Sequence, residues 1–174
     1  MSTVYRPICD AEFSRTVAEA AAYLASIADY RGFVDGEGWR HGVAHGSDIM
    51  LQLVLNPRAN AQHLTQIHKA VATQVAPTDT SYVFGESDRL ARPILYMALR
   101  HDVSEEVWRA WFENVTAPAP FGDWSETWAS EAGLAKRHNT RAFLQAVYVS
   151  AASSGRAELE ILRDLAREGL ATLG

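Results

Sequence analysis

The sequence predicts an all-α fold, with about eight antiparallel helices packed as stacked hairpins. Apolar residues recur with the 3.6-residue period of an amphipathic helix, whereas the alternation typical of strands is almost absent. The breaks between the periodic segments are short and rich in Gly, Pro, Asp and Asn. Short connections favour antiparallel neighbours. We therefore expect a compact bundle or a short HEAT-like solenoid, although no repeat of fixed period is present.

The composition is that of one helical domain over residues 1–174. The chain is 48% hydrophobic, which is enough to form a core that needs no disulfide or metal ion for stability. The single cysteine excludes an internal disulfide. The first residues lack a basic start followed by an apolar run, and no apolar stretch is long enough to span a membrane. We therefore expect a cytoplasmic protein without a membrane partner. The net charge is −5 and the cations are scattered, so we expect no nucleic-acid partner.

Four helices are predicted in the first hundred residues. The first follows a cap at Asp10, the second covers residues 39–56, and Pro93 lies near the start of the fourth. Outside residues 39–56, the apolar stripes are Phe13, Val17, Ala21 and Leu24; Leu64, Ile67, Val71 and Val75; and Leu90, Ile94 and Met97. His63 lies outside the third helix's stripe and His68 at its edge, so both are expected at or near the surface.

The second half of the chain predicts four more helices. Ser104 precedes Glu105 and Glu106, which suit the positive end of a helix dipole. Asp123 and Glu126 have the spacing of a capping box, and Asn139 is expected to cap the next helix. The apolar stripes are Val107, Trp108, Trp111, Phe112 and Val115; Phe143, Leu144, Val147, Tyr148 and Ala151; and Leu159, Leu162, Leu165, Ala166, Leu170 and Leu173.

The segment GWRHGVAHGSD (38–48) carries the most suggestive polar pattern. On a helix that turns about 100° per residue, His41, His45 and Asp48 share one face, opposite an apolar face. Two imidazoles and a carboxylate one turn apart can face one divalent metal ion. Three interpretations remain open: a buried network that ties this helix to its neighbours, a metal or ligand site, and a solvent-exposed stripe. Gly42 and Gly46 lie together and would let another element approach closely.

Two further features belong to this candidate site. Trp39 precedes the polar stripe and is expected in the core, although it can instead close one end of a pocket. The segment ESDRL (86–90) enters the fourth helix with acids in its first turn. The favoured interpretation is that these residues only begin the helix. In the functional alternative, Glu86 or Arg89 reaches the His41 segment, and Glu86 could ligate a metal ion or hold a histidine tautomer.

The segments DYRGFVDGEGWRHGVAHGSDIM, ESDRLARPI and NTRAFLQAVYVS together resemble the bacterial family described as domain of unknown function 2785. The likeness covers roughly residues 10 to 150, and its most specific part is the pattern Gly-Trp-x-His-x-x-Ala-His-x-x-Asp, starting at Gly38. Arg31 lies in the family's Asp-x-Arg-Gly element, and Glu86 and Arg89 in its acidic-Arg-Leu element. The resemblance implies an all-helical, soluble bacterial protein and no particular activity.

Two functions follow as hypotheses. The favoured one is a non-enzymatic module that binds a protein, a peptide or a small molecule. The polar network of such a module, at the helix junctions, comprises Arg31, Trp39, His41, His45, Asp48, Glu86 and Arg89. The alternative is a metal-dependent hydrolase, in which His41, His45 and Asp48 hold a divalent ion and Glu86 is a ligand or the general base.

Overall fold

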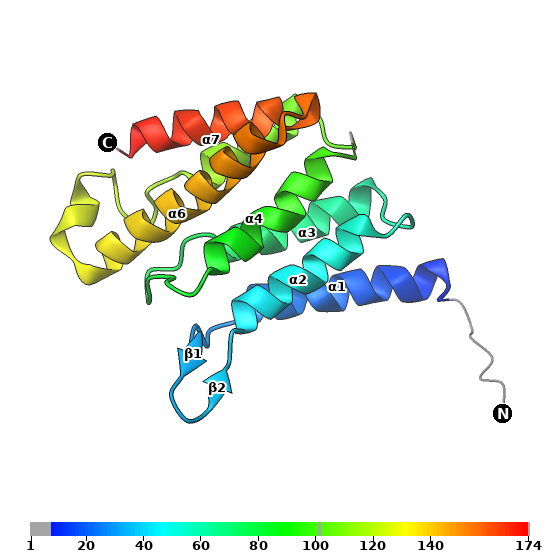
Figure 1. Ribbon diagram of the computed structural model, residues 1–174, viewed down its shortest axis with the longest axis horizontal. Coiled ribbons are helices and arrows are strands. Elements are labelled where there is room, and N and C mark those ends of the chain that lie inside the picture. The colour runs from blue at the N-terminus through cyan, green and yellow to red at the C-terminus, as the bar shows by residue number, and fades with distance from the viewer. Residues whose placement is uncertain (1–7, 101, 174) are drawn as a thin grey trace.

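The computed structural model describes residues 8–100 and 102–173, and this part of the chain is mostly helical (Figure 1). In chain order the elements are α1 (Asp10–Ser26), β1 (Phe33–Val34), β2 (Gly38–Trp39), α2 (Gly42–Leu55), α3 (Ala61–Gln74), α4 (Glu86–Ala98), α5 (Glu105–Val115), η1 (Glu126–Ala129), α6 (Glu131–Ser154), η2 (Ala157–Leu159) and α7 (Glu160–Thr172), where η denotes a 3₁₀ helix. The all-α prediction is confirmed, with seven α-helices in the described residues rather than eight.

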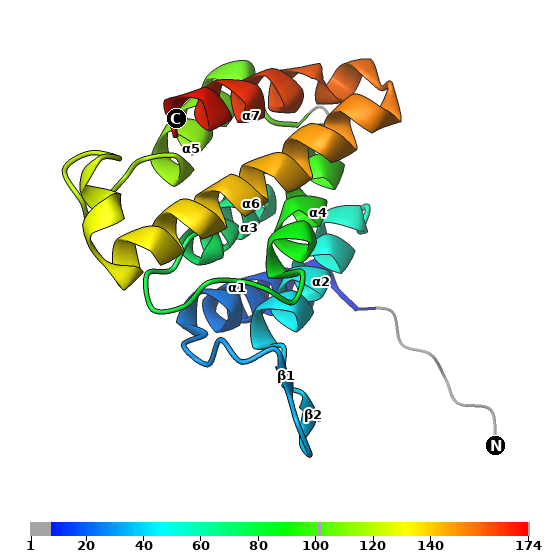
Figure 2. The same cartoon turned by 60° about the vertical axis from the view of Figure 1, so that its left-hand side comes forward.

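The helices stack in two layers. In one layer α2 packs on α4 and α4 on α6, and in the other α1 packs on α3, α3 on α5 and α5 on α7. The helix pairs α1–α2 and α6–α7 are antiparallel hairpins, at the bottom and the top of Figure 1. The short β1–β2 hairpin projects from the α1–α2 end, beside the loop that enters α4 (Figure 2). No described helix has the length and apolar character needed to cross a bilayer.

The helix count differs because the segment after Asp123 forms a short 3₁₀ helix instead of an α-helix, and the helix after it begins earlier than Asn139. Asn139 lies inside α6, which starts at the N-cap Ser130, whose hydroxyl oxygen accepts the Gly133 N–H at 3.1 Å. The Asp123 carboxylate accepts the backbone N–H groups of Ser125 and Glu126, but the turn it closes leads into η1 rather than into an α-helix. The two helices expected from residue 123 and from residue 139 are therefore η1 and one long helix.

Most residues of the apolar stripes form one hydrophobic cluster to which all seven α-helices contribute. Val107 is an exception, because it is 49% exposed at the edge of the α5 stripe. Phe13, Val17 and Leu24 on α1 are almost completely buried, as the helical period predicts. Gly46 on α2 is buried against α1, where a Cβ atom would lie 2.9 Å from the Leu24 side chain. The expected close approach at Gly46 is therefore an α1–α2 contact that leaves no room for a side chain.

Buried polar side chains join the helix ends. Gln74, at the end of α3, donates from Nε2 to the carbonyl oxygens of Leu24 and Ile27 at the C-terminus of α1. Asn139 reaches from α6 to the 75–85 connection between α3 and α4, where it bonds three backbone groups. These contacts set the position of the loops that border the candidate site.

Candidate functional site

His41 is the residue before α2, not a residue on its face. The expected helix from residue 39 begins only at Gly42, because Trp39 pairs with Phe33 in the hairpin and His41 is the N-cap. His41 has φ 36° and ψ 43°, a left-handed conformation that costs a residue with a Cβ atom about 1–2 kcal/mol. Its N–H donates to the Arg31 carbonyl oxygen at 2.9 Å, which locks this conformation to the hairpin. Residues with a strained backbone of this kind cluster at active sites and ligand-binding sites, so His41 is a candidate site residue.

A buried histidine–glutamate pair joins the start of α2 to the start of α4. Nε2 of His41 lies 3.3 Å from Oε1 of Glu86, and the two residues are 8% and 2% exposed. Oε2 of Glu86 accepts the Phe84 N–H at 2.9 Å. The His41–Glu86 contact lacks hydrogen-bond alignment, so Nε2 of His41 is a buried nitrogen without a hydrogen bond in the described structure. The first turn of α4 suits the Glu86 carboxylate because its free N–H groups carry positive charge.

An exposed aromatic cluster, formed by Phe33, Trp39 and Phe84, covers this pair. The Trp39 ring stacks on His41 at 4.9 Å between centroids, and meets Phe33 at 5.3 Å and Phe84 at 6.0 Å edge to face. Trp39 is 58% exposed, so the expectation that it packs in the core is wrong. The reason is that the hairpin carries its ring outside the helix layers, onto the surface above His41. Exposed rings gathered in this way are typical of binding surfaces.

The other predicted site residues have different partners. Asp48 forms an ion pair with Arg89, which joins α2 to α4 a second time. His45 is exposed, and its ring lies 6.1 Å from that of His41. The sequence left open whether Glu86 or Arg89 reaches this segment, and in the structure both side chains contact it.

The structure does not gather His41, His45 and Asp48 around one point. Among residues 8–100 and 102–173, no group of three His, Cys, Asp or Glu side chains is arranged to hold a metal ion. The divalent ion expected from their spacing stays a prediction.

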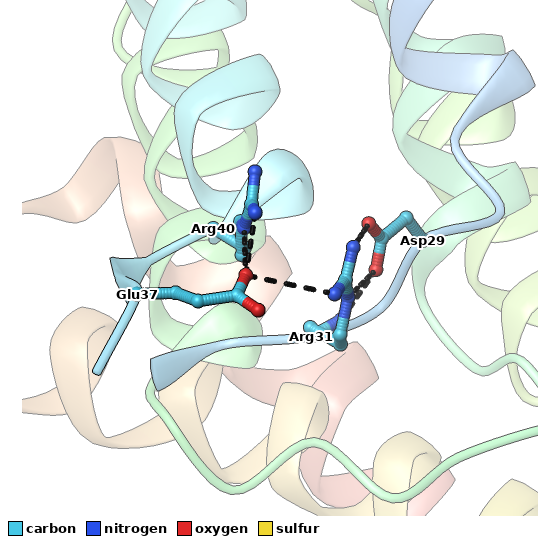
Figure 3. A network of polar contacts seen from close by, with 4 residues as sticks. All are labelled: Asp29, Arg31, Glu37 and Arg40. Carbon is cyan, nitrogen blue, oxygen red and sulfur yellow. Dashed lines mark hydrogen bonds and ion pairs between the residues drawn. The ribbon is translucent and has the colours of Figure 1, made fainter. Parts of the chain in front are cut away.

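Arg31 belongs to a chain of charges on the hairpin rather than to the His41–Glu86 pair. It binds the Asp29 carboxylate with two parallel hydrogen bonds, Nε to Oδ1 at 2.9 Å and Nη2 to Oδ2 at 2.6 Å. Glu37 bridges Arg31 and Arg40, so two carboxylates alternate with two guanidinium groups (Figure 3). The hydrogen bonds from Arg31 lower the pKa of Asp29 to about 2. These exposed pairs hold the hairpin's shape and leave it without net charge among the four residues.

A cleft of about 490 Å³, the junction cleft, opens beside Glu86 between the loop after α1 and the loop before α4. Its lining residues are Ala28, Asp29, Tyr30, Arg31, Gly32, Phe33, Val34, Asp79, Thr80, Ser81, Val83, Phe84 and Glu86. Gly32 is essential to this shape, because a Cβ atom there would overlap the Phe84 ring. The volume is in the range of small-molecule sites.

A second cavity, the α4–α6 cavity of about 590 Å³, adjoins the junction cleft, and Val83 and Glu86 line both. Ser87 and His138 also line the second cavity. Sequence reasoning missed Tyr30, Asp79, Phe84 and Ser87. Tyr30, Asp79 and Phe84 lie in loops, where no periodic pattern predicts burial. They line the cleft only because the fold brings these two loops together. The only available signal was the Gly, Ser, Thr and Asp content of the 76–85 break.

Replacing His41 separates its two roles. We expect His41→Ala to lower the free energy of unfolding by about 2 kcal/mol, because it leaves a buried carboxylate without its neighbour and keeps the left-handed strain. His41→Gly removes the same side chain but accepts positive φ, and is expected to be about 1 kcal/mol more stable than His41→Ala. Urea unfolding of both variants measures this. Equal stability would show that the conformation at residue 41 carries no strain.

Comparison with known proteins gives a family match. Neither curated proteins nor solved structures gave a significant match to the chain. The sequence model of the family described as "Protein of unknown function (DUF2785)" matches residues 3–149. The match includes the hairpin, the His41–Glu86 pair and both cavities. Because it covers well over half of the 174 residues, the chain belongs to the family described as Protein of unknown function (DUF2785).

Proposed function

We propose that this protein is a non-enzymatic binding module whose binding site is the junction cleft with the aromatic cluster at its rim. The observation that carries the proposal is the exposure of Phe33, Trp39 and Phe84, which are 45%, 58% and 42% exposed. Large rings left in water at the mouth of a cleft provide apolar contact area for a partner. The partner is a small molecule or a segment of a peptide or protein.

The polar residues support this proposal because they hold the cleft in shape. His41 and Glu86 fix the start of α2 against the start of α4, and the Asp48–Arg89 ion pair repeats the connection one to two turns further along α2. Binding surfaces gain affinity when their groups are ordered before the partner arrives. A metal-dependent hydrolase would instead need His41, His45 and Asp48 to converge on one ion, and each of them has a different environment.

Nuclear magnetic resonance tests the proposal with a fragment library balanced in cationic, anionic and neutral members. We expect binding fragments to shift the amide signals of residues 28–34 and 79–86 and the indole signal of Trp39. Trp128 supplies a matched control, because it is 62% exposed and lies outside the junction cleft. Trp39→Ala should abolish the shifts and Trp128→Ala should preserve them.

Two results would contradict the proposal. One is a set of fragments that shift signals only elsewhere on the surface, or that still bind to Trp39→Ala. The other is a near-stoichiometric transition metal in tag-free protein, measured by plasma mass spectrometry and lost in His45→Ala. The second result would favour the metal-dependent hydrolase.

A further inference from the structure

The charges that line the junction cleft do not balance. Arg31 is the one cation among the described lining residues, and Asp29 already binds it through two hydrogen bonds. Two carboxylates remain, Asp79 and Glu86. Asp79 forms no ion pair with any residue in 8–100 or 102–173, and Glu86 has only His41 as an ionisable neighbour in contact. The cleft therefore carries excess negative charge whenever His41 is neutral.

Two tyrosines border this negative region. Burial raises the pKa of Tyr30, and the charge of Asp79 raises it further. Burial also raises the pKa of Tyr82, with smaller contributions from Tyr30 and Glu86. Asp79 thus acts on a ring that lines the junction cleft, and Glu86 acts on a ring that lines the adjoining α4–α6 cavity.

Aromatic rings accompany the carboxylates. Tyr30, Phe33 and Phe84 line the cleft, and Trp39 contacts both phenylalanine rings. The face of an aromatic ring attracts a cation within about 6 Å, by roughly 0.5–1 kcal/mol at exposed sites. The same faces provide apolar contact for an alkyl or aryl body. Rings beside carboxylates that no Lys or Arg of the described chain neutralises suit an organic cation better than a hydrated metal ion.

Ser87 supplies an observation that is independent of charge. It is 6% exposed, it lines the adjoining α4–α6 cavity, and its hydroxyl is a buried group without a hydrogen-bond partner in the described structure. Buried hydroxyl groups are rarely left unpaired unless water or a ligand completes them. Ser87 follows Glu86 in the first turn of α4, and both residues line the α4–α6 cavity that adjoins the junction cleft.

We infer that the junction cleft binds an organic cation, an ammonium or guanidinium group carried on an alkyl or aryl body, between Asp79, Glu86 and the aromatic rings. The inference rests on the proposed function, which assigns the cleft as the binding site. A free amine and the Lys or Arg side chain of a peptide share this chemistry. The apolar body lies on Phe33 and Phe84, and the charge faces the carboxylates.

Isothermal titration with three probes of equal body and different charge tests the inference. The probes are benzamidine, benzyl alcohol and benzoate, each followed also by the amide signals of residues 28–34 and 79–86. We expect benzamidine to bind and the other two to bind at least ten-fold more weakly. Asp79→Asn should weaken benzamidine binding about five-fold, the size of one partly exposed ion contact. Asp35→Asn is the matched control, because it removes an equal charge from the exposed hairpin turn outside the cleft, and it should leave the affinity unchanged.

The outcomes separate this inference from the proposed function. If benzyl alcohol or benzoate shifts the cleft signals as strongly as benzamidine, the inference of a cationic ligand is contradicted, but the assignment of the cleft as a binding site is supported. Equal effects of Asp79→Asn and Asp35→Asn on the affinity for benzamidine would also contradict the inference of a cationic ligand. If no probe shifts these signals, the inference of a cationic ligand is contradicted. The fragment library then tests separately whether the cleft is a binding site.

A last comparison identifies the source of the cation. A short peptide with one Arg that binds ten-fold more tightly than free agmatine assigns the cation to a peptide side chain. Equal affinity assigns it to a free amine. Both results support the inference.

Discussion

The free energy of unfolding is expected to fall by about 3 kcal/mol as the pH is lowered from 7 to 4, because of one buried histidine. His68 on α3 lies between two indole rings of α5, stacked on Trp111 at 4.7 Å and edge to face with Trp108 at 4.7 Å. It is 5% exposed, and its Nε2 is a buried atom without a hydrogen-bond partner in the described chain. Burial lowers the pKa of His68 from 6.5 to about 4.

The sign of the effect follows from which state binds the proton. Between pH 6.5 and about 4 the unfolded chain is protonated at residue 68 and the folded chain is not, so lower pH favours unfolding. The stabilisation is complete above pH 6.5 and is lost progressively down to about pH 4. A difference between 6.5 and about 4 corresponds to about 3 kcal/mol, of which the attraction of the indole rings for an imidazolium offsets a part.

Urea unfolding at pH values from 4.5 to 7 measures this dependence in the wild type and in two variants. His68→Phe keeps an aromatic ring between the two indoles and removes the titration, so its stability should change much less over this range. His45→Gln removes an exposed imidazole and should retain the wild-type slope. Parallel curves for the wild type and His68→Phe would show that residue 68 titrates like a histidine in water.

The sequence placed His63 and His68 at the surface or its boundary, yet both are 5% exposed. The helical period correctly assigns the stripe of α3, but it cannot tell what covers the edges of that stripe. Trp108 and Trp111 come from α5, and they bury His68 by packing across the layer. Residues such as Val17 and Leu24 were predictable because their burial follows from position on their own helix.

In the candidate site, too, features that depend on one segment were easier to predict than features that depend on how segments pack together. The sequence offered a contact of Glu86 or Arg89 with the His41 segment only as an alternative to a plain helix start, because acids in the first turn suit any helix. Both contacts arise because α4 packs on α2. The left-handed His41 and the exposed Trp39 were not expected, because a hairpin of two-residue strands has no readable alternation. The cleft itself comes from two loops about fifty residues apart, and only the fold brings them together.

Asn139 is expected to have the largest effect of any single polar residue on the loop that borders this cleft. Its Nδ2 donates to the carbonyl oxygens of Pro77 at 2.9 Å and Thr80 at 2.8 Å, and its Oδ1 accepts the Tyr82 N–H at 2.8 Å. The side chain is completely buried. We expect Asn139→Ala to lower the free energy of unfolding by about 3–4 kcal/mol, because three backbone groups lose their partner in a dry site.

The isosteric change Asn139→Asp tests the direction of these hydrogen bonds. The carboxylate would still accept the Tyr82 N–H, but it would face two carbonyl oxygens without a proton to donate, so it should be at least as destabilising as alanine at neutral pH. Burial against two carbonyl oxygens raises the pKa of this carboxyl above its value in the unfolded chain, so the folded variant binds a proton first and regains one donor. Its deficit relative to Asn139→Ala should therefore shrink as the pH falls from 7 to about 4. A helix-capping role for Asn139, as the sequence suggested, would produce no such reversal.

Thr140→Val is the matched control, since Thr140 is equally buried and its hydroxyl bonds only the Lys136 carbonyl oxygen of its own helix. It should cost less than about 1 kcal/mol. Hydrogen exchange in Asn139→Ala should accelerate selectively at residues 78–85, and benzamidine should bind more weakly because Asp79 and Phe84 lose their fixed position. A loop that keeps its exchange protection in Asn139→Ala would mean that Tyr82, whose hydroxyl donates to the Gln74 carbonyl oxygen at 3.0 Å, holds the cleft wall without Asn139.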